Sequence, residues 1–328
     1  MRREQEAARR ATLGDSAGAR AAWRSAAESW RQCDRPVRAA RALAQALSDA
    51  PPDALGSALL AGVLQDVGQV VAAREAAEDA VRAAVEPGAR VLALDVLTGI
   101  LLMLGEVGAA RIHLETLRRS PGPAAALAAS FRLARFQRLE GDLEGAIAGL
   151  ESVVHGLPAA DRRFAAPRAA ALHDIAEFHL LAGRVDAAQS ALGIAGRAWA
   201  RARRRPGAFV AEGLSVRLGL ARGLPVLPDV LDNALDFAEQ RGLVLLGAEL
   251  RIARARAAAA VGREGASSDF DRAVEAAKRA QTPLLEGRAR LWRRVSGCLG
   301  DANDVVRTRE LLGADRILGL HPALGARK

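Results

Sequence analysis

The sequence contains no tyrosine, and phenylalanine and tryptophan together make up only 3% of its 328 residues. β-Sandwiches and β-barrels are rich in aromatic and β-branched side chains, so this shortage argues against both. Alanine, the strongest helix former, fills 75 positions instead. Half of the chain is hydrophobic, which excludes a disordered protein. We therefore predict an all-α fold.

Cysteine and lysine are scarce, with two of each. Cys33 and Cys298 lie far apart and lack the paired spacing of a zinc or redox motif, as expected in a reducing compartment. With Lys278 and Lys328 as the only lysines, the Gly-Lys pair of a phosphate-binding P-loop is absent. No nucleophile elbow or dinucleotide fingerprint occurs either. We expect no enzymatic activity, no cofactor and no metal.

Long apolar runs are missing as well. The first twelve residues have no apolar core of a signal peptide. The most apolar run, from Val91 to Leu104, is interrupted by Asp95 and is too short to span a bilayer. We therefore expect a cytoplasmic protein that does not bind membranes.

Positive charge is in excess, with 47 Lys and Arg against 38 acidic residues and a net charge of +9. Such an excess favours acidic partners through long-range attraction. The densest basic run, from Arg201 to Arg205, stands just before Pro206, where we expect a helix to end and cations to complement its dipole. No aromatic residues interleave with it, so nucleic acid is an unlikely partner, and steep salt dependence would be its signature.

The most informative feature is an internal repeat. A glycine recurs every 36 to 42 residues, at Gly68, Gly105, Gly141, Gly183, Gly223, Gly262 and Gly300. After the first four of these, an alanine follows five residues later, at Ala73, Ala110, Ala146 and Ala188, and a large aliphatic residue stands eight residues before each, at Leu60, Leu97, Leu133 and Ile175. The pattern predicts helical hairpins in which the glycine forms the turn and small residues let the helices approach closely. Stacked hairpins would bury a continuous core.

This pattern resembles the tetratricopeptide repeat (TPR), in its longer bacterial form. The first unit matches the family's turn, small, aromatic and small positions with Gly14, Ala19, Trp23 and Ala26. Prolines also fall between units, as in that family. The resemblance implies a right-handed α-solenoid of stacked antiparallel hairpins, a TPR-like superhelix, formed by residues 1–328 as one domain.

The repeats are clearer in residues 1–205 and degenerate in residues 206–328. After Gly262 the pattern fits better when shifted by one residue, to Ala266, Phe270 and Ala273. The stretch from Val37 to Leu47 fits no repeat slot and predicts an additional helix. The last stretch, Arg309 to Leu320, keeps more apolar residues than a solvated cap requires, so it covers the final hairpin or forms a dimer contact, and a homo-oligomer is possible.

In the TPR family the first helices of successive hairpins line a concave surface, and peptide-contacting side chains commonly stand ten, six and three residues before the turn glycine. Carried over to this sequence, the resemblance implies peptide contacts at Asp95, Phe131, Arg135, Arg138, His173, Glu177, Arg217, Arg256, Arg290 and Arg294. Most of these residues are basic. The resemblance thus implies a groove for an acidic peptide segment or a C-terminal carboxylate. Exposed arginines are also expected at random in a chain with this composition.

His173 and Glu177 share a helical face and are compatible with a metal, but a site needs further ligands. His179 points elsewhere and stands where the family has a buried aromatic residue, so we interpret it as a packing residue. The sequence therefore favours a non-catalytic scaffold that binds proteins or peptides. The alternative is a sensor or regulatory module of a bacterial signalling or transcription system.

Overall fold

The computed structural model describes residues 2–48, 53–158, 161, 164–298, 306–308 and 311, and every regular element in those ranges is a helix. None of the helices described is long and apolar enough to cross a membrane. The chain forms two compact units. Unit 1 comprises residues up to Ala129 together with Glu239–Leu245, and unit 2 comprises Ser130–Ala238 and the residues from Leu246 onward. The prediction of all-α structure is confirmed, whereas a single domain stays a prediction.

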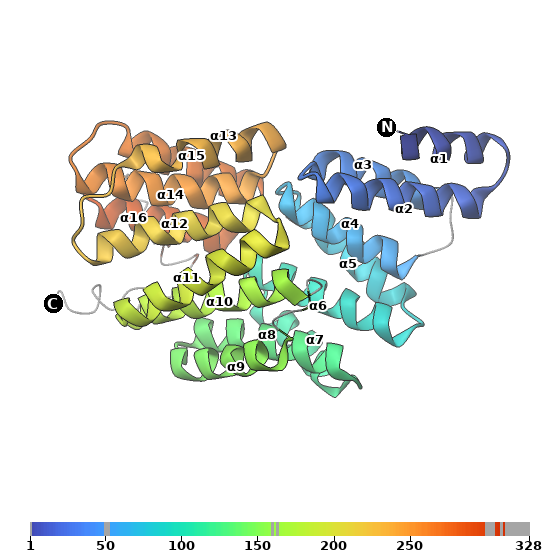
Figure 1. The fold of residues 1–328 in the computed structure, drawn as a ribbon, viewed down its shortest axis with the longest axis horizontal. Coiled ribbons are helices and arrows are strands. Elements are labelled where there is room, and N and C mark those ends of the chain that lie inside the picture. The colour runs from blue at the N-terminus through green and yellow to red at the C-terminus, as the bar shows by residue number, and fades with distance from the viewer. Residues whose placement is uncertain are drawn as a thin grey trace. The chain divides into compact units, whose positions relative to one another are not determined.

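Unit 1 begins with a hairpin, continues with a single helix that is not part of a two-helix repeat, and ends with two further hairpins (Figure 1). Its helices are α1 (Arg2–Thr12), α2 (Ser16–Gln32), α3 (Pro36–Leu47), α4 (Ala54–Asp66), α5 (Val70–Ala83), α6 (Pro87–Met103) and α7 (Val107–Arg119). Helix α3 is the additional helix that the stretch from Val37 predicted. It packs against both α2 and α4 through the buried residues Ala39, Ala42 and Leu43.

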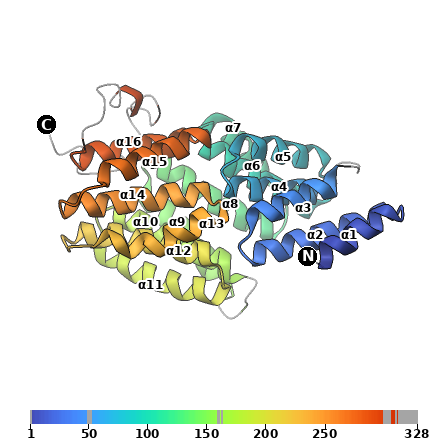
Figure 2. The ribbon, with the colours of Figure 1, turned by 90° about the horizontal axis from the view of Figure 1, so that it is seen from above.

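Unit 2 continues the hairpins, and Figure 2 shows α11, α12, α14 and α15 in succession across it. Its elements are α8 (Pro123–Glu140), α9 (Leu143–Gly156), α10 (Ala165–Leu181), α11 (Val185–Ala202), α12 (Arg205–Ala221), the 3-10 helix η2 (Pro228–Leu231), α13 (Asp232–Arg241), α14 (Val244–Ala260), α15 (Ala266–Arg279) and α16 (Pro283–Val295), and of these α8, α13 and α14 are shared with unit 1. The even-numbered helices from α8 to α16 are the first helices of their hairpins. First helices also contact one another, as α10 and α12 do.

The turns form as the repeat predicted. Gly141 has φ 86°, its N–H donates to the Arg138 carbonyl at 3.2 Å, and the Asp142 N–H donates to the Gln137 carbonyl at 2.9 Å. These two bonds satisfy carbonyls that the helix end leaves free, and a residue with a Cβ would be strained at this φ. The same φ region is found at each repeat glycine that the structure describes, Gly14, Gly68, Gly105, Gly183, Gly223 and Gly262.

Small residues after the turns close the hairpins. Ala73, Ala110 and Ala146 are completely buried, and Ala188 is nearly so. The one-residue shift expected after Gly262 is confirmed, because Ala266, Phe270 and Ala273 are all buried. Helix α11 ends at Ala202, within the basic run where a helix end was predicted.

Two expectations at the C-terminal end, a turn at Gly300 and a covering segment from Arg309 to Leu320, concern residues that the structure mostly does not describe. The turn after α16 lies at Gly297, with φ 72° and an N–H that donates to the Arg294 carbonyl at 3.0 Å. Gly300, where the repeat spacing placed that turn, lies outside the described residues. The stretch Arg309 to Leu320 also lies outside them, apart from Leu311.

Candidate peptide-binding site

Most of the residues predicted to contact a peptide come together on the first helices of unit 2. Arg135 and Arg138 belong to α8, His173 and Glu177 to α10, Arg217 to α12 and Arg256 to α14. Together with four neighbours they form a group that we call the arginine cluster. Its members are Arg135, Arg138, His173, Asp174, Glu177, Arg217, Glu249, Arg256, Arg288 and Trp292.

Ion pairs connect the first helix of one hairpin to the first helix of the next. Arg135 Nε lies 2.9 Å from Asp174 Oδ2, and Arg217 Nη1 lies 2.8 Å from Glu177 Oε1. Arg288 donates two hydrogen bonds to the Glu249 carboxylate, at 2.7 and 2.9 Å. The partners are separated by 39, 40 and 39 residues, which is one repeat in each case. The side chains of Arg217 and Glu177 are only 14% and 15% exposed, so this pair is largely removed from water.

Two guanidinium groups of the cluster have no carboxylate within ion-pair distance in the described part of the chain. Arg138 lies over the Phe178 ring, 5.9 Å from its centroid, and Arg256 lies 3.4 Å from the centroid of the Trp292 ring. Cation–π contact with a tryptophan fixes a guanidinium but leaves its charge without a counterion. Both arginines are partly buried. The cluster therefore holds five guanidiniums against three carboxylates.

The pKa shifts in the cluster reflect burial and this excess of cations. Burial lowers the pKa of Arg138, and the attraction of Glu177 offsets this only in part. Burial, followed by the guanidiniums of Arg217 and Arg288, lowers the pKa of Arg256 to about 9. Burial acts to raise the pKa of Glu177, but Arg217, Arg138 and Arg288 outweigh it and hold that pKa well below its ordinary value. Glu177 is therefore ionised at neutral pH.

His173 contributes a neutral ring to the cluster. Burial lowers the pKa of His173 more than Asp174 and Glu177 raise it. Its Nδ1 atom is buried and has no hydrogen-bond partner. Among the described residues, no group of three or more His, Cys, Asp and Glu side chains is arranged to hold a metal ion.

Four predicted contact residues lie outside the cluster. Phe131 contacts a member of the cluster, since the Arg135 guanidinium lies over its ring, 4.7 Å from the centroid. Arg290 is bound to Glu286 of its own helix at 2.9 Å, and Arg294 is exposed. The offsets fail on α16, and they still miss Arg288 and Trp292 when they are counted from the turn at Gly297, because they then give Gly287, Leu291 and Arg294. Asp95 lies on α6, in unit 1.

Sequence reasoning also missed Asp174, Glu249, Arg288 and Trp292. A usable signal exists for three of them, because Asp174 stands 39 residues after Arg135 and Arg288 stands 39 residues after Glu249. Pairs of opposite charge separated by about one repeat therefore add residues that offsets from a turn glycine miss, although Arg184 and Glu144, 40 residues apart, form such a pair outside the cluster. Trp292 is buried and also supports Arg256.

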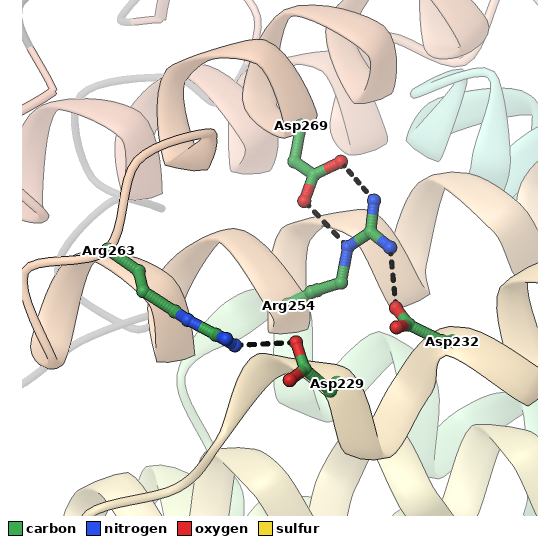
Figure 3. Close-up of polar contacts among 5 residues, drawn as sticks. All are labelled: Asp229, Asp232, Arg254, Arg263 and Asp269. Carbon is green, nitrogen blue, oxygen red and sulfur yellow. Dashed lines mark hydrogen bonds and ion pairs between the residues drawn. The ribbon is translucent and has the colours of Figure 1, made fainter.

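A second charged group in unit 2 has a structural character (Figure 3). Arg254 donates two hydrogen bonds to Asp269 at 2.7 Å and one to Asp232 at 2.8 Å. These bonds tie α14 to α15 and α13. Arg263 binds Asp229 nearby at 2.6 Å. Because successive helical residues are rotated by about 100°, Arg254 and Arg256 lie on nearly opposite sides of α14. The same helix thus supplies one arginine to the scaffold and one to the cluster.

Comparisons with known proteins show which solved structures have a similar fold. No protein-family model matches the chain, and no curated protein sequence matches it. The crystal structure of a Rap protein complexed with competence and sporulation factor is similar, with a TM-score of 0.50, 14% sequence identity, and coverage of 94% of this chain and 75% of that one. Yeast Tom70 covers 94% of this chain and 98% of its own at 12% identity, but its TM-score of 0.31 is too low to support an inference. The chain is therefore a TPR-like helical repeat protein that shares its fold with the Rap protein.

Proposed function

We propose that the chain is a non-catalytic interaction scaffold whose arginine cluster binds an acidic segment of a polypeptide. The observation that carries this proposal is the excess of two guanidiniums, Arg138 and Arg256, over the carboxylates of the cluster. A partly buried cation without a counterion costs folding free energy, and a ligand carboxylate would recover that cost.

The chemistry of the cluster supports a carboxylate ligand. Guanidinium groups bind carboxylates through two parallel hydrogen bonds, and such bonds gain strength where water is partly excluded. Ion pairs to Asp174, Glu177 and Glu249 hold the neighbouring arginines in place, so little side-chain freedom remains to be lost on binding. The likeness to the Rap protein, which was crystallised with the competence and sporulation factor, agrees with a binding role.

The test is a titration of the full chain with fluorescein-labelled peptides that carry internal or C-terminal runs of Asp and Glu, followed by anisotropy. We expect saturable binding that an Arg138→Gln/Arg256→Gln variant loses by at least about tenfold, because each charge-assisted bond contributes about 1.5–3 kcal/mol. The matched control is Arg197→Gln/Arg201→Gln, which removes two exposed arginines of α11. Equal affinity in both variants contradicts the assignment.

A second candidate is a sensor or regulatory module, favoured by the factor-bound Rap structure. A sensor must change its own structure when its ligand binds, whereas a scaffold need not. Hydrogen exchange with and without the best acidic peptide separates the two. Slower exchange in parts of unit 2 that do not contain the arginine cluster supports the sensor. Slower exchange confined to the helical segments that carry the cluster supports the scaffold.

A further inference from the structure

Unit 1 contains a hollow of about 310 Å³ beside the start of α3. Four arginines line it, Arg35, Arg38, Arg41 and Arg241, and the wall between them includes Val37 and Gly242. No acidic residue belongs to this lining in the described part of unit 1. The volume is at the lower end of the range found for small-molecule sites, about 300–1,000 Å³. Neither the TPR resemblance nor the arginine cluster of unit 2 involves these residues.

Two of the four arginines, Arg38 and Arg41, project from one face of α3, and Arg35 is the N-cap residue just before that helix. Arg35, Arg38 and Arg41 are spaced by three residues, a spacing that places side chains next to each other on a helix and makes like charges repel. Each is exposed, and none has an ion pair among the described residues. Two other arginines of unit 1 do have acidic partners: Arg24 lies 2.9 Å from Asp53, and Arg74 contacts both Glu78 and Glu106. Arg35, Arg38 and Arg41 thus bring three uncompensated charges to the hollow.

Two of the guanidiniums are held in place before any ligand arrives. Arg241 donates to the backbone carbonyls of Cys33 at 3.0 Å and Asp34 at 3.3 Å. Arg38 lies over the Trp30 ring, 4.7 Å from its centroid, and the Trp30 indole N–H is itself fixed by a 2.9 Å bond to Glu4. Prepositioned donors lower the entropy lost on binding an anion.

We propose that this hollow binds a compact phosphate-bearing anion, such as the diphosphate group of a small molecule. A phosphoryl group carries up to two negative charges, so a diphosphate can place several charges within a small volume beside these guanidiniums. Arginine also matches the geometry of phosphate oxygens. The inference stands apart from peptide binding by the arginine cluster, because it rests on different residues in a different unit.

The experiment is isothermal titration of the full chain with inorganic pyrophosphate at constant ionic strength. We expect saturable binding at one site in the wild type and a loss of at least about tenfold in Arg38→Gln/Arg41→Gln, since two charge-assisted contacts are removed. Arg90→Gln/Arg119→Gln, which removes two exposed arginines elsewhere in unit 1, is the matched control and should bind as the wild type does. Circular dichroism verifies that each variant is folded. If the double variant does not fold, the single variant Arg41→Gln replaces it in the titration.

Several results would overturn the proposal. Heat that does not saturate, or equal affinity in the α3 variant and its control, would show only non-specific attraction to a basic protein. Malonate binding as tightly as pyrophosphate would exclude a preference for phosphoryl groups. Pyrophosphate binding that is lost in the Arg138→Gln/Arg256→Gln variant would assign the anion to the arginine cluster instead. If that variant loses binding of acidic peptides but still binds pyrophosphate, the two ligands bind at separate sites, as proposed.

Discussion

At the scale of single residues, Arg256 shows how the fold places a cation where it is poorly solvated. Its guanidinium lies on the Trp292 ring and has other guanidiniums, not carboxylates, as its charged neighbours. Burial and these neighbours lower the pKa of Arg256 to about 9. The unfolded chain keeps the much higher pKa of an ordinary arginine. Above pH 9 the unfolded state therefore binds more protons than the native state.

This difference predicts a pH dependence of stability with a definite sign. As the pH rises above about 9, the free energy of unfolding of the wild type should increase relative to that of Arg256→Gln, by up to about 1.4 kcal/mol per pH unit. The measurement is urea denaturation of both proteins between pH 8 and 10.5. A difference that stays constant over this range would contradict the lowered pKa. Since an anion would raise that pKa again, peptide binding near pH 9 should take up protons.

At the scale of secondary-structure elements, charged side chains connect helices that glycine turns alone do not hold. Arg254 is 25% exposed and Asp269 is 10% exposed, and their two bonds join α14 to α15 (Figure 3). The pair formed by Arg263 and Asp229 is 51% and 60% exposed. The two arginines stand nine residues apart in sequence, yet only Arg254 satisfies a buried carboxylate.

Arg254→Ala should therefore reduce the free energy of unfolding by about 2–4 kcal/mol, because it leaves the Asp269 carboxylate buried without its partner. Arg263→Ala should leave the urea midpoint nearly unchanged, since water already solvates that pair. Urea denaturation of the two variants and the wild type provides the comparison. Similar losses in both variants would mean that exposure does not decide the strength of these ion pairs.

At the scale of the whole molecule, the net charge of +9 is not spread evenly. Part of the excess is concentrated in the arginine cluster, where it costs stability, and part lines the hollow of unit 1, where it is exposed. Functional sites commonly keep such unfavourable charges because ligand binding needs them.

We predict that Arg138→Gln/Arg256→Gln raises the melting temperature by about 2–4 °C while it weakens binding of acidic peptides, since removing uncompensated charge favours the folded state. Differential scanning calorimetry at pH 7 measures the first effect. A lower melting temperature would indicate that the contacts of the two arginines with Phe178 and Trp292 contribute more than the charge costs.

The sequence by itself determined the helical class and most of the hairpins. These features are local: a repeat glycine reaches positive φ without strain, and an alanine five residues later allows close packing wherever the pair occurs. The repeat glycines do not predict turns without a glycine, although a helix end was expected near Arg203. Asp34, Arg203 and Gln281 also have positive φ, near 52°, 53° and 52°, and close helix ends with the same hydrogen bonds. Asp adopts positive φ more often than most residues, but arginine and glutamine rarely do, so the residue types at Arg203 and Gln281 do not predict that conformation.

Only the tertiary structure decided which charged residues meet. Arg135, Arg138, Arg217 and Arg256 were expected on one surface, but their partners depend on where neighbouring helices end and how each is rotated. Arg288 therefore joins the cluster, whereas Arg290 binds Glu286 and Arg294 is exposed, although the three stand within seven residues on α16. A side chain's direction changes by about 100° with each helical residue, so Arg288 and Arg290, two residues apart, point to nearly opposite sides of α16.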